Sequence, residues 1–224
     1  IVLADKQTEL VHKVAEKIEA RAFVGDMSSE ANIVALIKET EKHYGEIDVF
    51  CSNAGVIYLG SEQASNAEWQ DCWDLHLMAH VFAARHLAPK MASRGEGYLL
   101  NTASAAGLLS HVNSATYTVT KHAAVAFAEW ISVAYGDLGV KVSVLCPQAV
   151  QTPMIEGRDS GAATLDGVIS PEFLADCVID SMGREEFLIL PHPEVRNYMR
   201  RKNDDTDRWL RGMRKHKTLF PESI

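Results

Sequence analysis

The stretch YLLNTAS, residues 98–104, decides the fold of this 224-residue chain. Its apolar start reads as a short buried strand, and the polar residues Thr102 and Ser104 come where that strand ends. A helical pattern follows over about 113–136 and leads into a second apolar strand at 140–145. Strands and helices that alternate in this way predict a parallel sheet with helices on both faces.

The same alternation extends in both directions. We expect further strands at 1–4, 22–24, 47–51 and 187–190, and helices at about 7–20, 29–43, 66–93, 171–182 and after Pro193. The sequence contains no internal repeat and no linker. It therefore predicts one α/β domain over residues 1–224, a Rossmann-like, doubly wound parallel sheet in a three-layer α/β/α arrangement.

Composition excludes several classes of protein. The chain is 47% hydrophobic and 23% charged, as in soluble globular proteins, and its net charge of −8 would repel nucleic acid. The basic residues near the end are interpreted as a solvated helix face. No run of about 18 apolar residues indicates a membrane span. The four cysteines, without a C-x-x-C pair, predict free thiols in the cytoplasm.

The pair Tyr117 and Lys121 carries the strongest chemical signal. Four residues apart on a helix, the two side chains share one face, with Cβ atoms about 5 to 6 Å apart. A tyrosine with a pKa near ~10 is a poor base, but an adjacent ammonium favours the phenolate and allows proton exchange with a substrate hydroxyl. By itself such a pair is usually a surface contact.

Ser104 changes the interpretation of that pair. It lies thirteen residues before Tyr117 and directly after a strand, and open α/β sheets bind ligands at the carboxyl ends of their strands. A hydroxyl at that place can orient a substrate oxygen, although a serine there is ordinarily a turn residue.

Four motifs, taken together, resemble the short-chain dehydrogenase/reductase family in order and spacing. They are Asn53-Ala54-Gly55, the segment 101–107 (NTASAAG), the Tyr117 and Lys121 pair, and the segment 147–152 (PQAVQT). The resemblance covers nearly the whole chain, and the last ~30 residues carry it least. It implies a nicotinamide-dependent oxidoreductase that acts on a secondary alcohol or ketone.

The resemblance also implies roles for individual residues. Tyr117 corresponds to the catalytic acid/base, Lys121 to the residue that lowers its pKa and binds the nicotinamide ribose, and Ser104 to the substrate-orienting hydroxyl. The cofactor-binding residues implied are Asp5, Asp26, Met27, Asn53, Ala54, Gly55, Tyr117, Lys121, Pro147, Val150 and Thr152. Asp26 next to Met27 would contact adenine or merely cap a helix before Ser28 and Ser29, and Val150 and Thr152 would hold the carboxamide.

Cofactor choice follows from Asp5, at the end of the first strand. A carboxylate there accepts hydrogen bonds from the ribose hydroxyls and repels a 2′-phosphate, so we expect NAD rather than NADP. Lys6 would soften that preference.

Two positions depart from the family pattern. His76 stands where an asparagine usually anchors a proton path to the lysine, and its imidazole would donate or accept a bond or titrate near neutrality; we include it among the candidate catalytic residues. His76 and His80 imitate half of a metal site, but no third ligand follows, so we expect no metal. Gln148 replaces a glycine and would shape the substrate pocket.

The beginning of the chain lacks the glycine-rich turn with which such folds hold a pyrophosphate. We expect roughly 20 to 30 further residues upstream, which would supply the central strand. Without that strand, 1–4 and 22–24 would have no neighbour that joins them to 47–51.

The remaining expectations concern substrate and assembly. By resemblance, the pocket is lined by Ala105, Leu108, Leu109, His111, Asn113, Gln148 and Ile155, with Gly157–Gly167 as a mobile lid or a plain loop. Broad apolar faces on the two long helices predict a homodimer or homotetramer. The alternatives are an acyl-thioester reductase, an epimerase or a cofactor-binding relative without turnover.

Overall fold

A computed structural model describes residues 1–156 and 162–220. All its strands pair in parallel, as predicted. They are β1 (Val2–Asp5), β2 (Arg21–Val24), β3 (Val49–Ser52), β4 (Gly97–Thr102), β5 (Val140–Leu145) and β6 (Leu188–Ile189). Because parallel strands need crossovers, a helix follows nearly every strand.

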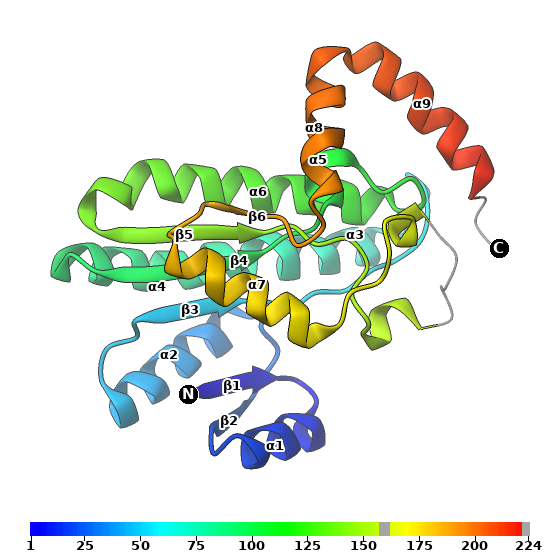
Figure 1. Cartoon of the computed structure of the whole chain (residues 1–224). Helices are drawn as coiled ribbons and strands as arrows, with labels where there is room; N and C mark the ends of the chain where they lie inside the picture. The colour runs from blue at the N-terminus through cyan, green and yellow to red at the C-terminus, as the bar shows by residue number, and fades with distance from the viewer. Residues whose placement is uncertain (157–161, 221–224) are drawn as a thin grey trace.

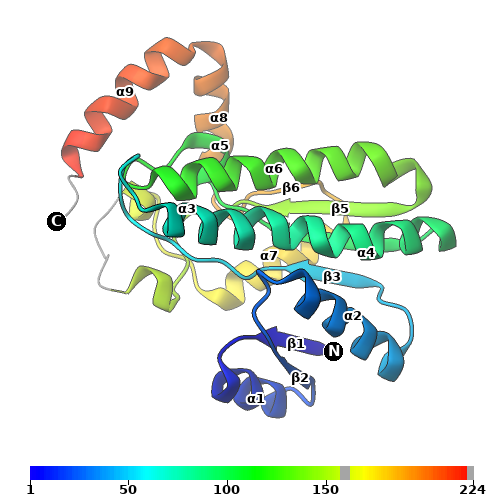
Figure 2. The ribbon, with the colours of Figure 1, turned by 180° about the vertical axis from the view of Figure 1, so that it is seen from behind.

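The helices cover both faces of the strands. They are α1 (Thr8–Lys17), α2 (Glu30–Tyr44), α3 (Asn66–Trp73), α4 (Ala79–Arg94), α5 (Ala106–Leu109), α6 (Ala115–Tyr135), α7 (Pro171–Gly183), α8 (Glu194–Asp204) and α9 (Thr206–Leu219). The helices α2, α4 and α6 lie on one face and α7 on the other, while α8 and α9 project from one end of the molecule (Figures 1 and 2). The three-layer α/β arrangement is thereby confirmed.

The strands form two sheets, β1-β2 and β3-β4-β5-β6. The prediction that the first two strands have no neighbour that joins them to the third is confirmed. The connection between the sheets is made by α2, whose buried Ile33 and Ile37 share a core with Ala79 and Ala83 of α4. Apolar packing between α2 and α4 therefore joins α2, the helix that follows β2 in the chain, to the rest of the molecule.

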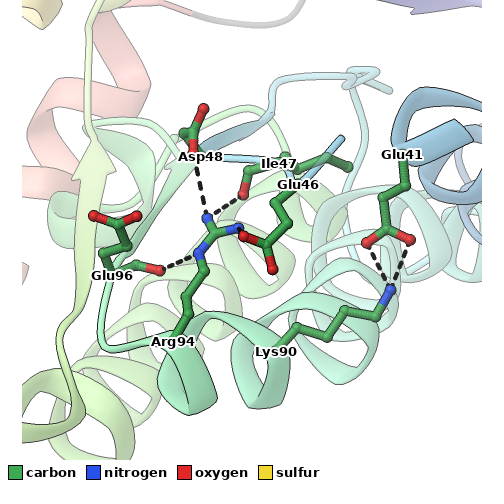
Figure 3. A network of polar contacts seen from close by, with 7 residues as sticks. All are labelled: Glu41, Glu46, Ile47, Asp48, Lys90, Arg94 and Glu96. Carbon is green, nitrogen blue, oxygen red and sulfur yellow. Dashed lines mark hydrogen bonds and ion pairs between the residues drawn. The ribbon is translucent and has the colours of Figure 1, made fainter. Parts of the chain in front are cut away.

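Polar contacts strengthen the same junction at the carboxyl end of α4 (Figure 3). The Arg94 guanidinium donates to the carbonyls of Ile47, at 2.6 Å, and Glu96, at 2.8 Å. One helical turn earlier, the Lys90 ammonium lies 2.6 Å from a carboxylate oxygen of Glu41 on α2. Arg94 is only 14% exposed, so its bonds to backbone are worth more than those of a surface ion pair.

A glycine makes the approach of α5 to α6 possible. A Cβ at Gly107 would stand 2.5 Å from the carbonyl oxygen of Lys121. Only glycine allows the two backbones to come this close, and the contact sets α5 directly against the turn that carries the lysine.

Three local features differ from the sequence expectation. The helix predicted over 66–93 is interrupted by a π-helical turn at Asp74–Met78. The segment Ala106–Leu109, for which no element was predicted from the sequence, is helical. The last helix is divided at Asp205, whose side chain accepts from the Arg208 N–H and so starts a new helix. Of the residues described, no helix has the length and apolar character needed to cross a membrane.

Candidate active site

The end of β4 and the start of α6 bring the three predicted catalytic residues together. Ser114 caps α6, because its hydroxyl accepts from the Tyr117 N–H at 3.2 Å, which places Tyr117 in the first helical turn and Lys121 in the next. Ser104 follows β4, and its side chain is hydrogen-bonded with the Tyr117 phenol. All three side chains are buried. The grouping predicted from the sequence is therefore present.

Lys121 is held by a hydrogen bond to the last residue of β4. Its ammonium donates to the Thr102 carbonyl at 2.9 Å and lies 5.5 Å from the centroid of the Tyr117 ring. Burial lowers the pKa of Lys121 to about 8. An ammonium has three donors, and one acceptor is found for it among the described residues, so further donors remain for a ligand.

Tyr117 differs from expectation in its acidity. Burial raises the pKa of the Tyr117 phenol, and the hydrogen bond from the Ser104 side chain only partly offsets this. The prediction that Lys121 lowers this pKa is wrong, since the pKa is raised and Lys121 is not among the causes of the shift. The ammonium lies over the ring and donates to Thr102 instead of the phenol oxygen, so desolvation prevails.

His76 lies in the π-helical turn beside Tyr117, with the two rings 5.3 Å apart and nearly perpendicular. Its Nε2 accepts from the Val56 N–H at 3.1 Å, which leaves Nδ1 to carry the hydrogen and donate to Thr120 Oγ1 at 2.8 Å. Burial lowers the pKa of His76 to about 2. The expectation of titration near neutrality is wrong, and with both nitrogens engaged His76 holds the segment after β3 against α6.

His80 lies one turn after His76, is 2% exposed, and has no partner for either ring nitrogen among the described residues. Burial lowers its pKa to about 3, so the ring is neutral. The residues that the structure describes contain no group of three His, Cys, Asp or Glu side chains that could hold a metal ion.

The implied cofactor residues lie at the carboxyl ends of successive strands. Asp5 ends β1 and accepts from the Gln7 N–H at 2.8 Å, and Asp26 follows β2 and accepts from the Ser28 N–H at 2.9 Å. The bonds from Ser28 hold the pKa of Asp26 below its usual range. Asp26 thus bonds within the turn before α2, whose N-cap is Ser29, so the alternative role of Asp26 as a helix cap is wrong. One carboxylate oxygen of each acid remains without a partner in the described part.

The segment after β3 reaches the catalytic residues. Asn53 Oδ1 accepts from the Thr102 hydroxyl at 3.1 Å, and Ala54 and Gly55 follow. A Cβ on Gly55 would lie 3.7 Å from Lys121 Nζ and 3.5 Å from His76 Nε2. The lysine thus lies directly beside this backbone, as a shared cofactor contact requires. Met27 packs against the main core.

The segment after β5 contacts Ser104 and Ala105. The carbonyl of Pro147 accepts from the Ala105 N–H at 2.9 Å and from Ser104 Oγ at 3.4 Å. Val150 bridges to Ile169, and its carbonyl accepts from the Thr152 hydroxyl. The structure therefore places 147–152 beside Ser104, at the carboxyl edge of the sheet.

The arrangement fits a nicotinamide cofactor. Carboxylates with an unused oxygen end β1 and β2, and a buried ammonium with unused donors lies by β4. Ribose hydroxyls are both donors and acceptors, so this set of residues matches a dinucleotide laid along the carboxyl edge. When bound, the nicotinamide would supply the hydride acceptor or donor.

A cavity of about 890 Å³ opens over the catalytic residues, with Ser104 and Tyr117 in its lining. Of the predicted lining residues, Ala105, Leu109, His111, Gln148 and Ile155 are found there. Leu108 and Asn113 are not. Leu108 packs against the apolar cluster that contains Val195 of α8, and the Asn113 amide donates to the Phe220 carbonyl at 2.9 Å. The predicted lid lies outside the described residues at 157–161, while Leu165 and Asp166 line the cavity.

One wall of the cavity, called here its outer wall, was not predicted from the sequence. It is formed by α8 and α9, called here the helical pair (residues 194–219). Its cavity residues include Tyr198, Arg201, Arg208, Trp209, Met213 and His216. The spacing of Trp209, Met213, His216 and Phe220 marks one face of a helix and could have revealed a wall, but it does not say what that face covers.

Comparison with known proteins agrees with this site. Residues 1–162 match the family model described as short chain dehydrogenase, and the chain belongs to this family. A 1-deoxy-11-beta-hydroxypentalenate dehydrogenase of Streptomyces exfoliatus is 30% identical over 236 aligned residues, which cover 100% of this chain and 82% of the relative. Levodione reductase of Leifsonia aquatica is 30% identical over 148 residues, 65% of this chain and 55% of that one.

Solved structures show the same fold. A short-chain dehydrogenase/reductase of Burkholderia phymatum in complex with NAD has a TM-score of 0.82 at 24% identity, over 92% of this chain and 84% of that one. A gluconate 5-dehydrogenase of Burkholderia cenocepacia in complex with NADP and tartrate has a TM-score of 0.75 at 22% identity, over 85% and 82%. Both nicotinamide cofactors therefore occur on this fold.

Proposed function

We propose that this protein is a nicotinamide-dependent alcohol dehydrogenase or ketone reductase in which Ser104 and Tyr117 act on the substrate oxygen and Lys121 binds the cofactor. The observation that carries the proposal is the burial of the three side chains together: Ser104 and Tyr117 line the cavity, and the Lys121 ammonium lies 5.5 Å from the centroid of the Tyr117 ring. The names of the relatives, a dehydrogenase and a reductase, support the same reaction class.

Each residue has a distinct task. Ser104 Oγ binds the substrate oxygen and orients it. Tyr117, whose pKa is raised by burial, carries a proton that it donates to a ketone oxygen and becomes a phenolate; in the reverse direction the phenolate takes the proton back from the alcohol. Lys121 uses its remaining donors for the ribose hydroxyls of the cofactor. His76 acts as a positioning residue through Val56 and Thr120.

The proposals on the cofactor, the compartment and the domain organisation rest on fewer residues. Asp5 supports NAD over NADP, because its free carboxylate oxygen would meet the ribose and repel a 2′-phosphate. The free thiols of the described residues support a reducing compartment, the cytoplasm. We propose that residues 1–224 act as one catalytic domain and take small molecules as their substrates.

Assembly is proposed from the outer face of α6. Val119, Trp130 and Val133 are 46%, 60% and 86% exposed and lie along one side of the helix with Ala123 and Ala126. Contact between two such faces would bury them in an isologous homodimer, which could pair again into a tetramer. Light scattering of the wild type and of Trp130→Glu tests this, and an unchanged mass would contradict it.

The reaction is tested with Tyr117→Phe, which removes only the phenol oxygen. We expect NADH oxidation with a panel of cyclic ketones to fall by about a thousandfold or more, while NADH binding, followed by its fluorescence, remains. Tyr135→Phe, at the far end of the same helix, is the matched control. Binding without turnover in the wild type would instead favour the non-catalytic relative.

A further inference from the structure

Two arginines of the helical pair line the same cavity as Ser104 and Tyr117. Arg201 comes from α8 and Arg208 from the first turns of α9, and both line the cavity while remaining exposed. Neither guanidinium forms an ion pair or hydrogen bond within the described part of the chain. Arg201 only stacks on the Tyr198 ring, at 5.9 Å from the centroid.

Much of the remaining lining is apolar. It includes Leu109, Met154, Ile155, Trp209 and Met213. A ligand in the cavity therefore meets the hydroxyl groups of Ser104 and Tyr117, apolar side chains, and two cationic side chains from α8 and α9. Its chemistry must match this set of groups.

Three carboxylates also line the cavity and must be weighed against the arginines. Asp166 accepts from Gln148 Nε2 and from the Tyr198 hydroxyl, both at 2.9 Å, so its oxygens are engaged. Asp205 accepts from the Arg208 backbone N–H. Asp204 makes no ion pair with either arginine among the described residues.

We propose that the substrate is an apolar alcohol or ketone that carries a carboxylate at the end remote from the reacting carbon, and that Arg201 and Arg208 bind this carboxylate. The inference rests on the proposed function for the position of the reacting carbon. A planar guanidinium matches a carboxylate with two parallel hydrogen bonds, which a neutral substrate would not use.

Binding is measured without turnover, so that its result is independent of the reaction. The probes are 8-anilinonaphthalene-1-sulfonate, an apolar body with one anionic group, and N-phenyl-1-naphthylamine, the same body without it. We expect Arg201→Gln and Arg208→Gln each to weaken the sulfonate probe by about fivefold, and the double variant by about twentyfold, with little effect on the neutral probe.

Arg211→Gln is the matched control, since Arg211 lies three residues after Arg208 on the same helix but does not line the cavity. It should leave both probes unchanged. Asp204→Asn removes the opposing charge and should tighten the sulfonate probe only. Circular dichroism verifies that each variant is folded.

Competition then identifies the anionic group. Decanoate, decyl phosphate and 1-decanol displace the bound probe, and decanoate should lose most of its advantage over decanol in the double variant. Equal loss with Arg211→Gln, or a ratio of the two probe affinities that the Arg201 and Arg208 variants leave unchanged, would overturn the proposal. A preference for decyl phosphate over decanoate would overturn the assignment to a carboxylate. Loss of turnover with probe binding intact would count only against the reaction.

Discussion

The proposed catalytic residues and the helical pair differ in burial and in charge. Ser104, Tyr117 and Lys121 are each at most 9% exposed, on elements that pack against the main core. In contrast, α9 has no buried residue, and the pair contains nine Lys and Arg against four Asp and Glu in a chain whose net charge is −8. Chemistry needs desolvated, rigid groups, whereas a wall that selects substrates can be assembled from exposed side chains.

Lys121→Met should have the largest effect and sharpens this contrast. We expect kcat/KM to fall by about a thousandfold, since the cofactor contact and the charge beside Tyr117 are both lost. The variant should nevertheless fold, because a methionine of similar length replaces a buried ammonium with a single acceptor. Thermal unfolding with steady-state kinetics checks both; strong destabilisation would contradict the second expectation.

The same variant gives a pH test. In the folded state Lys121 loses its proton near pH 8, whereas in the unfolded chain it keeps it to about 10.5. Unfolding therefore takes up a proton in this window, and the free energy of unfolding of the wild type should rise with pH relative to that of Lys121→Met. Urea titrations between pH 7 and 10 measure the difference; a constant difference would mean that the lysine is not desolvated.

Lys202→Met acts on the helical pair. It removes the bond from the ammonium to the Leu108 carbonyl, which attaches α8 to α5. We expect KM for the ketone to rise several-fold while kcat changes little, and a loss of stability of about 1 to 2 kcal/mol. Lys215→Met, on the exposed face of α9, is the control. An equal fall in kcat would show that the two regions are not separable.

Arg94→Met should change stability alone. Arg94 joins α4 to the start of β3 (Figure 3) and does not line the cavity. Loss of its backbone contacts should cost about 1 to 3 kcal/mol of unfolding free energy with kcat and KM unchanged. Arg85→Met, which breaks an exposed ion pair with Glu30, should cost at most about 0.5 kcal/mol.

His76→Gln should have the smallest effect on pH dependence. Since the pKa of His76 is about 2, the ring is neutral throughout the working range and contributes no titration step. Between pH 5.5 and 7.5 the shape of the kcat/KM profile should match that of the wild type, even if its height falls through the lost bond to Thr120. A step near pH 6.5 that disappears in the variant would contradict this.

The sequence by itself determined most of the fold and the grouping of the proposed catalytic residues. A tyrosine and a lysine four residues apart share a helical face by geometry alone, and a serine after a buried strand must lie at the carboxyl edge of a parallel sheet. The isolation of β1 and β2 from β3 also followed from the topology of parallel sheets.

Only the tertiary structure decided the ionisation of these residues and the outer wall of the cavity. Whether Tyr117 is more or less acidic than usual depends on burial against the position of the ammonium, and spacing cannot weigh those two effects. Likewise, the two hydrogen bonds of His76 depend on residues that are distant in the sequence, and the bond to Val56 spans 20 positions. The course of α8 and α9 over the cavity depends on contacts such as that between Asn113 and Phe220, 107 positions apart. The local periodicity of a sequence does not predict contacts between residues so far apart along the chain.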